Sequence, residues 1–214
     1  MIDVKQFAFN HYIENSYLLT DTVTGDCALV DPGMTSDAEE KRLNQYLLSH
    51  ALKLKLVLLT HAHVDHIAGL RRVCERYNLP VALHRDGWPL LRQAPTYGIM
   101  MGFGQVDDMS SLNTRWVEDD EVLPLGESRI EARWVPGHCP GSLCFVLHDE
   151  RLVVSGDALF RMSIGRTDLP GGDYDLLTEK IRSRLMCLED DYQVLPGHGE
   201  LTTIGDERRS NPFF

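Results

Sequence analysis

The run Thr60-His61-Ala62-His63-Val64-Asp65-His66 constrains this chain more than any other feature of its sequence. It directly follows Leu54–Leu59, an apolar stretch of the length expected for a buried strand. Side chains two residues apart in an extended loop point the same way, so the first two histidines are placed to hold one ion. Asp65 and His66 come as the chain turns into a helix and point elsewhere. The spacing therefore favours two neighbouring metal ions over one.

Three further polar residues lie in short loops, each directly after a glycine. They are His138 in Pro136-Gly137-His138, Asp157 in Ser155-Gly156-Asp157 and His198 in Pro196-Gly197-His198. Neutral imidazoles and carboxylates are ligands that zinc, iron and manganese accept. Because a carboxylate has two oxygens and Asp157 stands alone in its loop, we interpret Asp157 as a bridge between two ions. A single loop histidine is usually just solvated, but this combination predicts a metal site.

Other histidines and cysteines carry no such signal. Cys139 follows His138, and we expect it to pack or to support the site, because an adjacent side chain normally points away. Four histidines have no motif around them and are interpreted as surface or packing residues: His11, His50, His84 and His148.

Strands and helices alternate along the chain, which predicts one α/β domain with helices outside and two sheets inside. A capping box at Ser36–Glu39 starts a helix that runs to about His50. The stretch 94–112 is the only long irregular segment that we expect, and it is either a binding loop or an apolar loop folded onto the core. Further strands are predicted at Ser16–Thr20, Cys27–Val30, Val81–Leu83, Ile130–Val135, Leu143–Leu147, Leu152–Ser155 and Val194-Leu195, with helices through Ile67–Tyr77 and from Asp173 to Leu188.

Composition excludes some classes of partner. The formal net charge of −11 argues against nucleic acid or an anionic membrane as the main partner, because the sequence has no basic stripe that could bind either. The five cysteines form no C-x-x-C pair, which favours reduced thiols and neither a zinc ribbon nor a redox motif. The N-terminus lacks the order of a signal peptide, and no apolar run approaches the roughly 18 residues of a membrane span. We expect a cytoplasmic protein.

The whole set of motifs resembles the metallo-β-lactamase superfamily: T-H-x-H-x-D-H, then G-H, G-D and a late G-H. The resemblance covers nearly the whole chain and implies a four-layer αβ/βα sandwich. It also implies that Asp31-Pro32-Gly33 supports the metal-binding loop without ligating. The implied ligands are His61, His63 and His138 for one metal, Asp65, His66 and His198 for the other, and Asp157 for both.

Within that superfamily the chain looks like the short glyoxalase II-like proteins. The resemblance rests on Asn15-Ser16-Tyr17-Leu18, Ser163–Asp168 and the tail from Thr202 to Pro212. Full-length glyoxalase II enzymes add a C-terminal helical domain that supplies part of the glutathione-binding surface. Because this chain stops at Phe214, we expect a single domain over residues 1–214 without it. The thiol carrier therefore stays open.

The resemblance implies a dinuclear metal-dependent hydrolase that cleaves a hydroxyacyl thioester such as S-lactoylglutathione by attack of a metal-bound hydroxide. Two divalent ions are expected, zinc first, with iron or manganese as alternatives. Asp65 and Asp157 are the catalytic candidates, and Arg166 is the candidate that binds substrate, unless it pairs internally with Asp168. The oligomeric state is not predicted.

The main alternative is a persulfide dioxygenase, which this chain also resembles through Gly165-Arg166-Thr167-Asp168. Such an enzyme uses one iron held by two histidines and one aspartate. Those three ligands would be His61, His138 and Asp157, which all belong to the larger set. A lactamase or lactonase would use the same hydroxide, and a non-catalytic metal-dependent module is the alternative outside enzymes.

Overall fold

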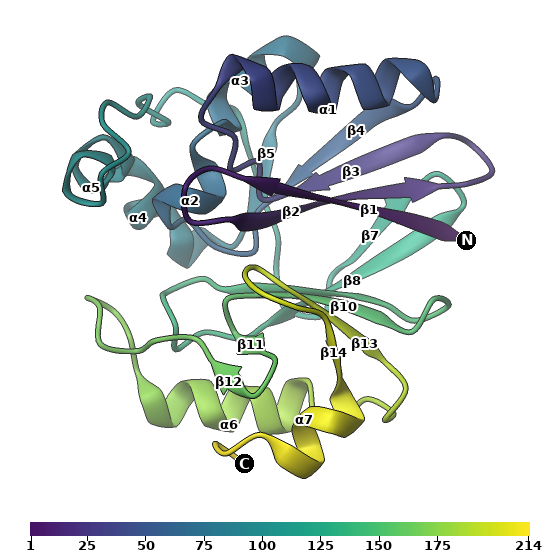
Figure 1. Cartoon of the computed structure of the whole chain (residues 1–214), viewed down its shortest axis with the longest axis vertical. Coiled ribbons are helices and arrows are strands. Elements are labelled where there is room, and N and C mark those ends of the chain that lie inside the picture. Colours follow the sequence, from purple (N-terminus) through teal and green to yellow (C-terminus); the bar gives the residue numbers. More distant parts are fainter.

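Two six-stranded sheets lie face to face, with helices on both outer sides (Figure 1); the computed structural model describes residues 1–214. The first sheet has the order β1 (Ile2–Phe9), β2 (Glu14–Asp21), β3 (Asp26–Val30), β4 (Lys53–Leu58), β5 (Val81–Leu83) and β6 (Thr114–Trp116). The second has the order β14 (Thr202–Thr203), β13 (Gln193–Pro196), β10 (Leu152–Gly156), β9 (Leu143–Leu147), β8 (Ser128–Trp134) and β7 (Val122–Leu125).

The helices complete four layers and confirm the predicted αβ/βα sandwich. One outer side carries α1 (Asp37–Ser49) and α3 (Leu70–Tyr77), and the other carries α6 (Tyr174–Arg184) and α7 (Ile204–Ser210). Short elements gather at one end of the sandwich, on the left in Figure 1: α2 (Val64–Ile67), the 3-10 turn η1 (Arg85–Gly87), α4 (Trp88–Arg92) and α5 (Ala94–Met100). A small hairpin, β11 (Leu159–Phe160) and β12 (Ser163–Ile164), follows β10.

Alternation of side chains along the central strands builds the layers. In β2, Leu18 packs toward α1 and α3, whereas Leu19 packs between the sheets. In β9, Phe145 also lies between the sheets, whereas Cys144 and Val146 pack against α6. Both faces of each sheet are thus buried, which explains why these strands read as unbroken apolar runs.

The predicted elements are mostly confirmed, with shifts of a residue or two at their ends. The helix predicted through Ile67–Tyr77 is an exception, because a turn at Ala68-Gly69 separates α2 from α3. The Ser36 capping box is formed, because its hydroxyl accepts from the Glu39 amide. Asp173 caps α6 in the same way, but this helix ends at Arg184 rather than reaching Leu188. The prediction for 94–112 was wrong in part, since its first seven residues form α5. Pro95 in the first turn and the absence of an apolar period hid that helix.

Two smaller findings bear on the sequence analysis. All five cysteines are free thiols. No helix has the length and hydropathy needed to cross a membrane.

Candidate metal centre

The candidate ligands converge because their strands end at the same edge of the sandwich. In the second sheet β8, β10 and β13 run in one direction, and they deliver His138, Asp157 and His198 at their carboxyl ends. In the first sheet β4 leads into the histidine run and α2. All seven predicted ligands therefore lie in one cluster, although the first, His61, and the last, His198, are 137 positions apart in the sequence.

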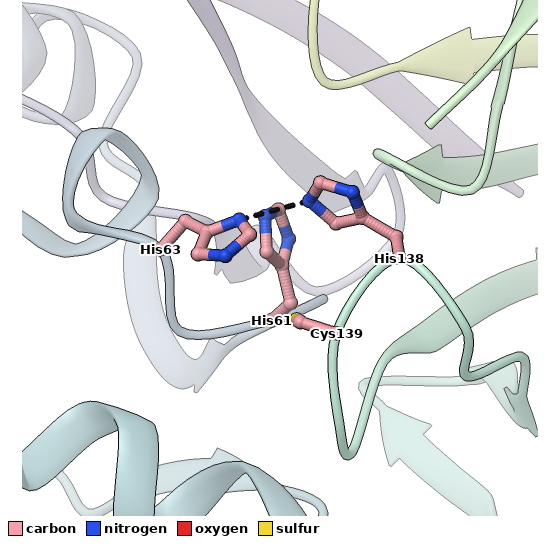
Figure 2. A group of neighbouring side chains, drawn as sticks. All are labelled: His61, His63, His138 and Cys139. Carbon is pink, nitrogen blue, oxygen red and sulfur yellow. Dashed lines mark hydrogen bonds between the residues drawn. The ribbon is translucent and has the colours of Figure 1, made fainter. Parts of the chain in front are cut away.

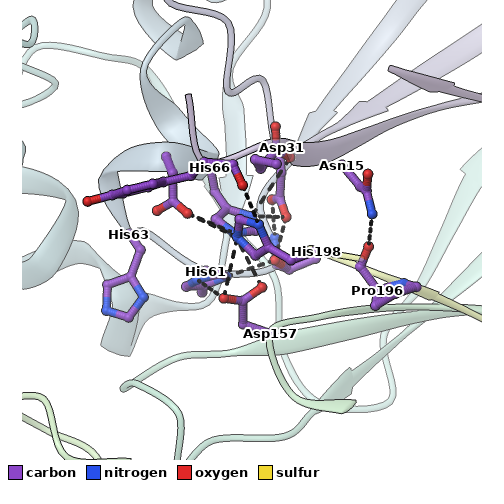
Figure 3. A network of polar contacts seen from close by, with 12 residues as sticks. Asn15, Asp31, His61, His63, His66, Asp157, Pro196 and His198 are labelled. Atoms are coloured by element: carbon purple, nitrogen blue, oxygen red, sulfur yellow. Dashed lines mark hydrogen bonds and ion pairs between the residues drawn. The ribbon is translucent and has the colours of Figure 1, made fainter. Parts of the chain in front are cut away.

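The Asp157 carboxylate points toward the histidines of this cluster (Figure 3). One of its oxygens, Oδ2, is 4.0 Å from His61 Nε2 and 3.7 Å from His138 Nε2. The same oxygen is 3.8 Å from His198 Nε2, while Oδ1 is 3.4 Å from His66 Nε2. Ligands about 2.1 Å from a tetrahedral ion lie roughly 3.4 Å apart, so these separations suit donors that share an ion.

The second set of donors surrounds Asp65. Its Oδ2 is 3.1 Å from His198 Nε2 and 3.7 Å from His66 Nε2. These three residues form one group of converging donor atoms, separate from the group that contains His61, His63 and His138. Asp157 contacts members of both groups, which is the position required of a bridging carboxylate.

Unsatisfied polar atoms show that the site fits a metal. Three side-chain atoms at the centre are buried without a hydrogen-bond partner: His61 Nε2, His66 Nε2 and Asp157 Oδ1. Buried polar groups nearly always have a partner, and leaving one unpaired is costly. Since these atoms also face one another across the cluster, a coordinated cation is the partner that would satisfy all three.

Hydrogen bonds on the far side of each ring fix which nitrogen faces the centre. His138 donates from Nδ1 to the Arg166 carbonyl at 2.8 Å. His66 donates from Nδ1 to Asp31 Oδ2 at 2.9 Å, and His198 donates from Nδ1 to the Tyr12 carbonyl at 3.2 Å. Each leaves Nε2 as the inward lone pair, the usual arrangement of metal-binding histidines.

Asp31 has the supporting role that the resemblance implied. Its Oδ1 accepts from the Thr60 amide at 2.7 Å and its Oδ2 from the Thr60 hydroxyl at 2.5 Å. The hydroxyl in turn is 3.0 Å from His61 Nδ1, so it accepts from that ring. Although Asp31 lies within reach of His61 and His66, its oxygens are engaged by these donors.

His63 and His138 face each other across the remaining part of the site (Figure 2). His63 Nδ1 is 2.8 Å from His138 Nε2, so His63 offers Nδ1 where the other rings offer Nε2. The Cys139 sulfur lies closer to these histidines than we expected from its place in the chain. It contacts Ser142 Oγ at 3.3 Å, and burial raises the pKa of its thiol to about 12, which keeps it protonated.

The pKa values of the histidines shift in opposite directions in the two groups of ligands. Burial lowers the pKa of His61 and His138, and it lowers the pKa of His63 to about 4, so these rings are neutral and able to ligate. Burial alone would also lower the pKa of His66 and His198. The neighbouring Asp157 and Asp65 outweigh it and raise both values, which marks excess negative charge that a cation would balance.

Close backbone approach holds the last ligand loop. A Cβ atom on Gly197 would lie 2.3 Å from Asp157 Oδ1 and 2.7 Å from His66 Cε1, so only glycine fits there. Asn15 anchors the same loop by donating from its amide to the Pro196 and Gly199 carbonyls at 3.0 and 3.1 Å. The resemblance pointed to Asn15, but only the structure shows what it does.

A cavity of about 710 Å³ opens over the cluster, and Arg166 lines it. The Arg166 guanidinium donates two hydrogen bonds of 2.8 Å to the Asp168 carboxylate, the internal pair that we had weighed against substrate binding. Sequence reasoning missed Tyr12 and Leu90 at this cavity. Tyr97, Met100 and Met101 also line it, and they belong to the 94–112 stretch for which a binding loop was one of the two expectations.

Comparison with known proteins agrees with the fold. The metallo-beta-lactamase superfamily profile matches residues 10–198. The chain is 37% identical to hydroxyacylglutathione hydrolase GloC of Haemophilus influenzae, over 88% of this chain and 87% of that protein.

Two solved structures are similar over almost their whole length. BLEG-1 B3 metallo-beta-lactamase has a TM-score of 0.87 and 32% identity, covering 99% of both chains. TTHA1623, in a di-iron-bound form, has a TM-score of 0.86 and 34% identity, covering 98% of this chain and 100% of that one. The chain belongs to the metallo-beta-lactamase superfamily.

Proposed function

We propose that this member of a superfamily of metal-dependent hydrolases cleaves a hydroxyacyl thioester such as S-lactoylglutathione, with two divalent metal ions, zinc first. The observation that carries the two-ion part is the position of Asp157 between two groups of donors. The name of the Haemophilus relative supports the thioester, and the di-iron form of TTHA1623 supports a pair of ions.

His61, His63 and His138 would hold one ion, Asp65, His66 and His198 the other, and Asp157 both. When bound, such cations lower the pKa of a water molecule from about 15.7 toward about 7 and stabilise negative charge on a carbonyl oxygen.

The chain's own residues supply orientation and proton transfer. The His66 and His198 rings lower the pKa of Asp65 against the effect of burial, so its carboxylate is ionised. Asp65 lines the cavity, and we assign it the acceptance of a proton from the attacking water. A thiolate leaves readily, which fits a site with many ligands and no separate strong acid.

Metal content and hydrolysis test the proposal together. We expect two ions per chain in protein purified without added metal, and turnover of S-lactoylglutathione. Replacing Asp157 with Ala should remove or severely weaken both sites and abolish turnover. The matched control is Asp149→Ala, which removes an exposed carboxylate in the turn between β9 and β10 and should change neither. An Asp157→Ala protein with two ions and full activity would contradict the bridging role.

The alternative is the one-iron persulfide dioxygenase. His61 and His138 lie 4.0 and 3.7 Å from the same Asp157 oxygen, which is the arrangement that a single iron would need. One iron per chain, with oxygen uptake on glutathione persulfide and no thioester hydrolysis, would replace the hydrolase proposal with this one.

A further inference from the structure

The cavity over the metal centre has one strongly apolar wall. Its floor is polar, with His63, Asp65, His138 and Asp157. Its volume of about 710 Å³ is that of a site for a small organic molecule. The apolar wall comes from the two short helices α4 and α5, through Leu90, Ala94, Tyr97, Met100 and the following Met101, and Leu169 and Pro170 add apolar surface from the loop before α6.

Positively charged side chains are scarce around this cavity. Arg166 is the only lysine or arginine that lines it. Its guanidinium is already paired with the Asp168 carboxylate through two hydrogen bonds. An anionic carrier such as a peptide thiol with two carboxylates therefore finds no free cation among the lining residues. The lining favours an uncharged, apolar part of a substrate over a charged one.

The apolar wall is a fixed part of the fold. The Tyr12 hydroxyl donates to the Met101 carbonyl at 3.0 Å, and the Phe103 amide donates to the Gly98 carbonyl at 2.8 Å. Gly98 packs so closely on Val106 that a Cβ atom would lie 2.3 Å from a Val106 methyl carbon. A surface that is preformed loses little entropy when a ligand covers it, so its apolar area is available for binding.

Met100 is the most exposed residue of this wall, with 72% of its surface accessible. A large apolar side chain in that position is left mostly in contact with solvent, and methionine adapts its shape to different ligands. We propose that the thioester cleaved most efficiently carries an apolar alkyl or aryl group of several carbons next to the scissile bond, which packs on the α4–α5 wall, and that S-lactoylglutathione, which lacks such a group, is cleaved less efficiently. This inference rests on the proposed thioester hydrolysis for the reaction, but the binding of the apolar group stands independently of it.

Two series of thioesters test the inference. In the first, the thiol is glutathione and the acyl group is acetyl, lactoyl, butanoyl or hexanoyl, so the leaving group is constant. In the second, acetyl is constant and the thiol is ethane-, butane- or hexanethiol. Each CH₂ buried on the wall should raise kcat/KM by roughly twofold to fourfold. The series that rises shows whether the acyl or the thiol side packs there.

Equilibrium binding gives a readout that needs no turnover. S-hexylglutathione has five more CH₂ groups than S-methylglutathione, and neither is hydrolysed. Calorimetry should show at least about a tenfold tighter binding of the hexyl compound. The variant Met100→Gln, of similar shape but polar, should reduce this preference by about threefold or more. The control Met162→Gln makes the same change at an exposed methionine outside the cavity and should preserve it.

The outcomes separate the two proposals. If kcat/KM is flat in both series and the hexyl and methyl compounds bind equally, the inference is overturned while thioester hydrolysis stands. If no thioester is cleaved by the metal-loaded protein but the hexyl compound binds more tightly and Met100→Gln removes the preference, the apolar site stands and the proposed reaction falls.

Discussion

The clearest test of the supporting residues is Asp31→Asn, a change of chemistry without a change of shape. Asp31 is 1% exposed and accepts three hydrogen bonds, two from Thr60 and one from His66. Asparagine keeps one accepting oxygen but presents an NH₂ group in place of the other. At least one buried donor therefore loses its acceptor, whichever way the amide turns.

The magnitude follows from the contacts. Whichever way the amide turns, the His66 ring is no longer held by a carboxylate, and loss of such a partner costs about 10- to 100-fold in metal affinity. This factor corresponds to about 1.4–2.7 kcal/mol of binding free energy. A buried donor without an acceptor also lowers the free energy of unfolding by about 1–3 kcal/mol.

Metal affinity by chelator competition and urea unfolding of the metal-free protein measure the two effects separately. The matched control is Asp21→Asn, because Asp21 is also fully buried and accepts from Ser128 and Thr24, but far from the metal centre. Both variants should be less stable, and only Asp31→Asn should bind metal more weakly. Unchanged metal affinity in Asp31→Asn would refute the role of Asp31 in orienting His66.

Three further predictions follow from single contacts. Gly197→Ala should lower metal affinity by tenfold or more, because its Cβ would overlap Asp157 Oδ1, whereas Gly87→Ala, whose nearest neighbour would be at 3.7 Å, should leave it unchanged in the same chelator assay. Hydrogen bonds from Ser128 and Thr24 hold the pKa of Asp21 well below its usual range. Its carboxylate therefore stabilises the fold above about pH 4, and this contribution is lost as the pH falls further, so Asp21→Asn should show a smaller drop in urea midpoint between pH 7 and pH 3. Ser36→Ala removes the cap of α1 and should lower the free energy of unfolding by about 1 kcal/mol, measured by urea titration.

Much of the fold and site could be predicted because the signals are local. The histidine run indicates a metal site from seven consecutive residues. The capping box at Ser36 likewise predicts the start of a helix, and the apolar run Leu143–Leu147 predicts a strand. Glycine before each further ligand indicates a tight turn after a strand. Local patterns of this kind survive in any arrangement of the elements, so they can be read without knowing the arrangement.

Only the tertiary structure decided what depends on neighbours that are distant in the chain. Short elements such as α5, β11 and β14 are stabilised by packing and strand pairing with other parts of the chain. Their own sequences therefore have no hydrophobic periodicity that predicts them. The anchoring of the loop around His198 by Asn15 joins segments more than 180 residues apart in the sequence. The pairing of Arg166 with Asp168 is a choice between two partners that sequence alone left open.

The metal ligands and the cavity above them show the same difference between what the sequence determines and what the structure determines. The sequence by itself determined which residue types follow which strands, and thereby the chemistry of a histidine and aspartate metal site. The structure decided that Asp157 lies between both groups of donors and that an apolar wall faces them, because both depend on how the two sheets and the α4–α5 segment pack. The metal-binding residues can be recognised from short local sequences, whereas the shape and polarity of a cavity arise from surfaces that meet only after folding.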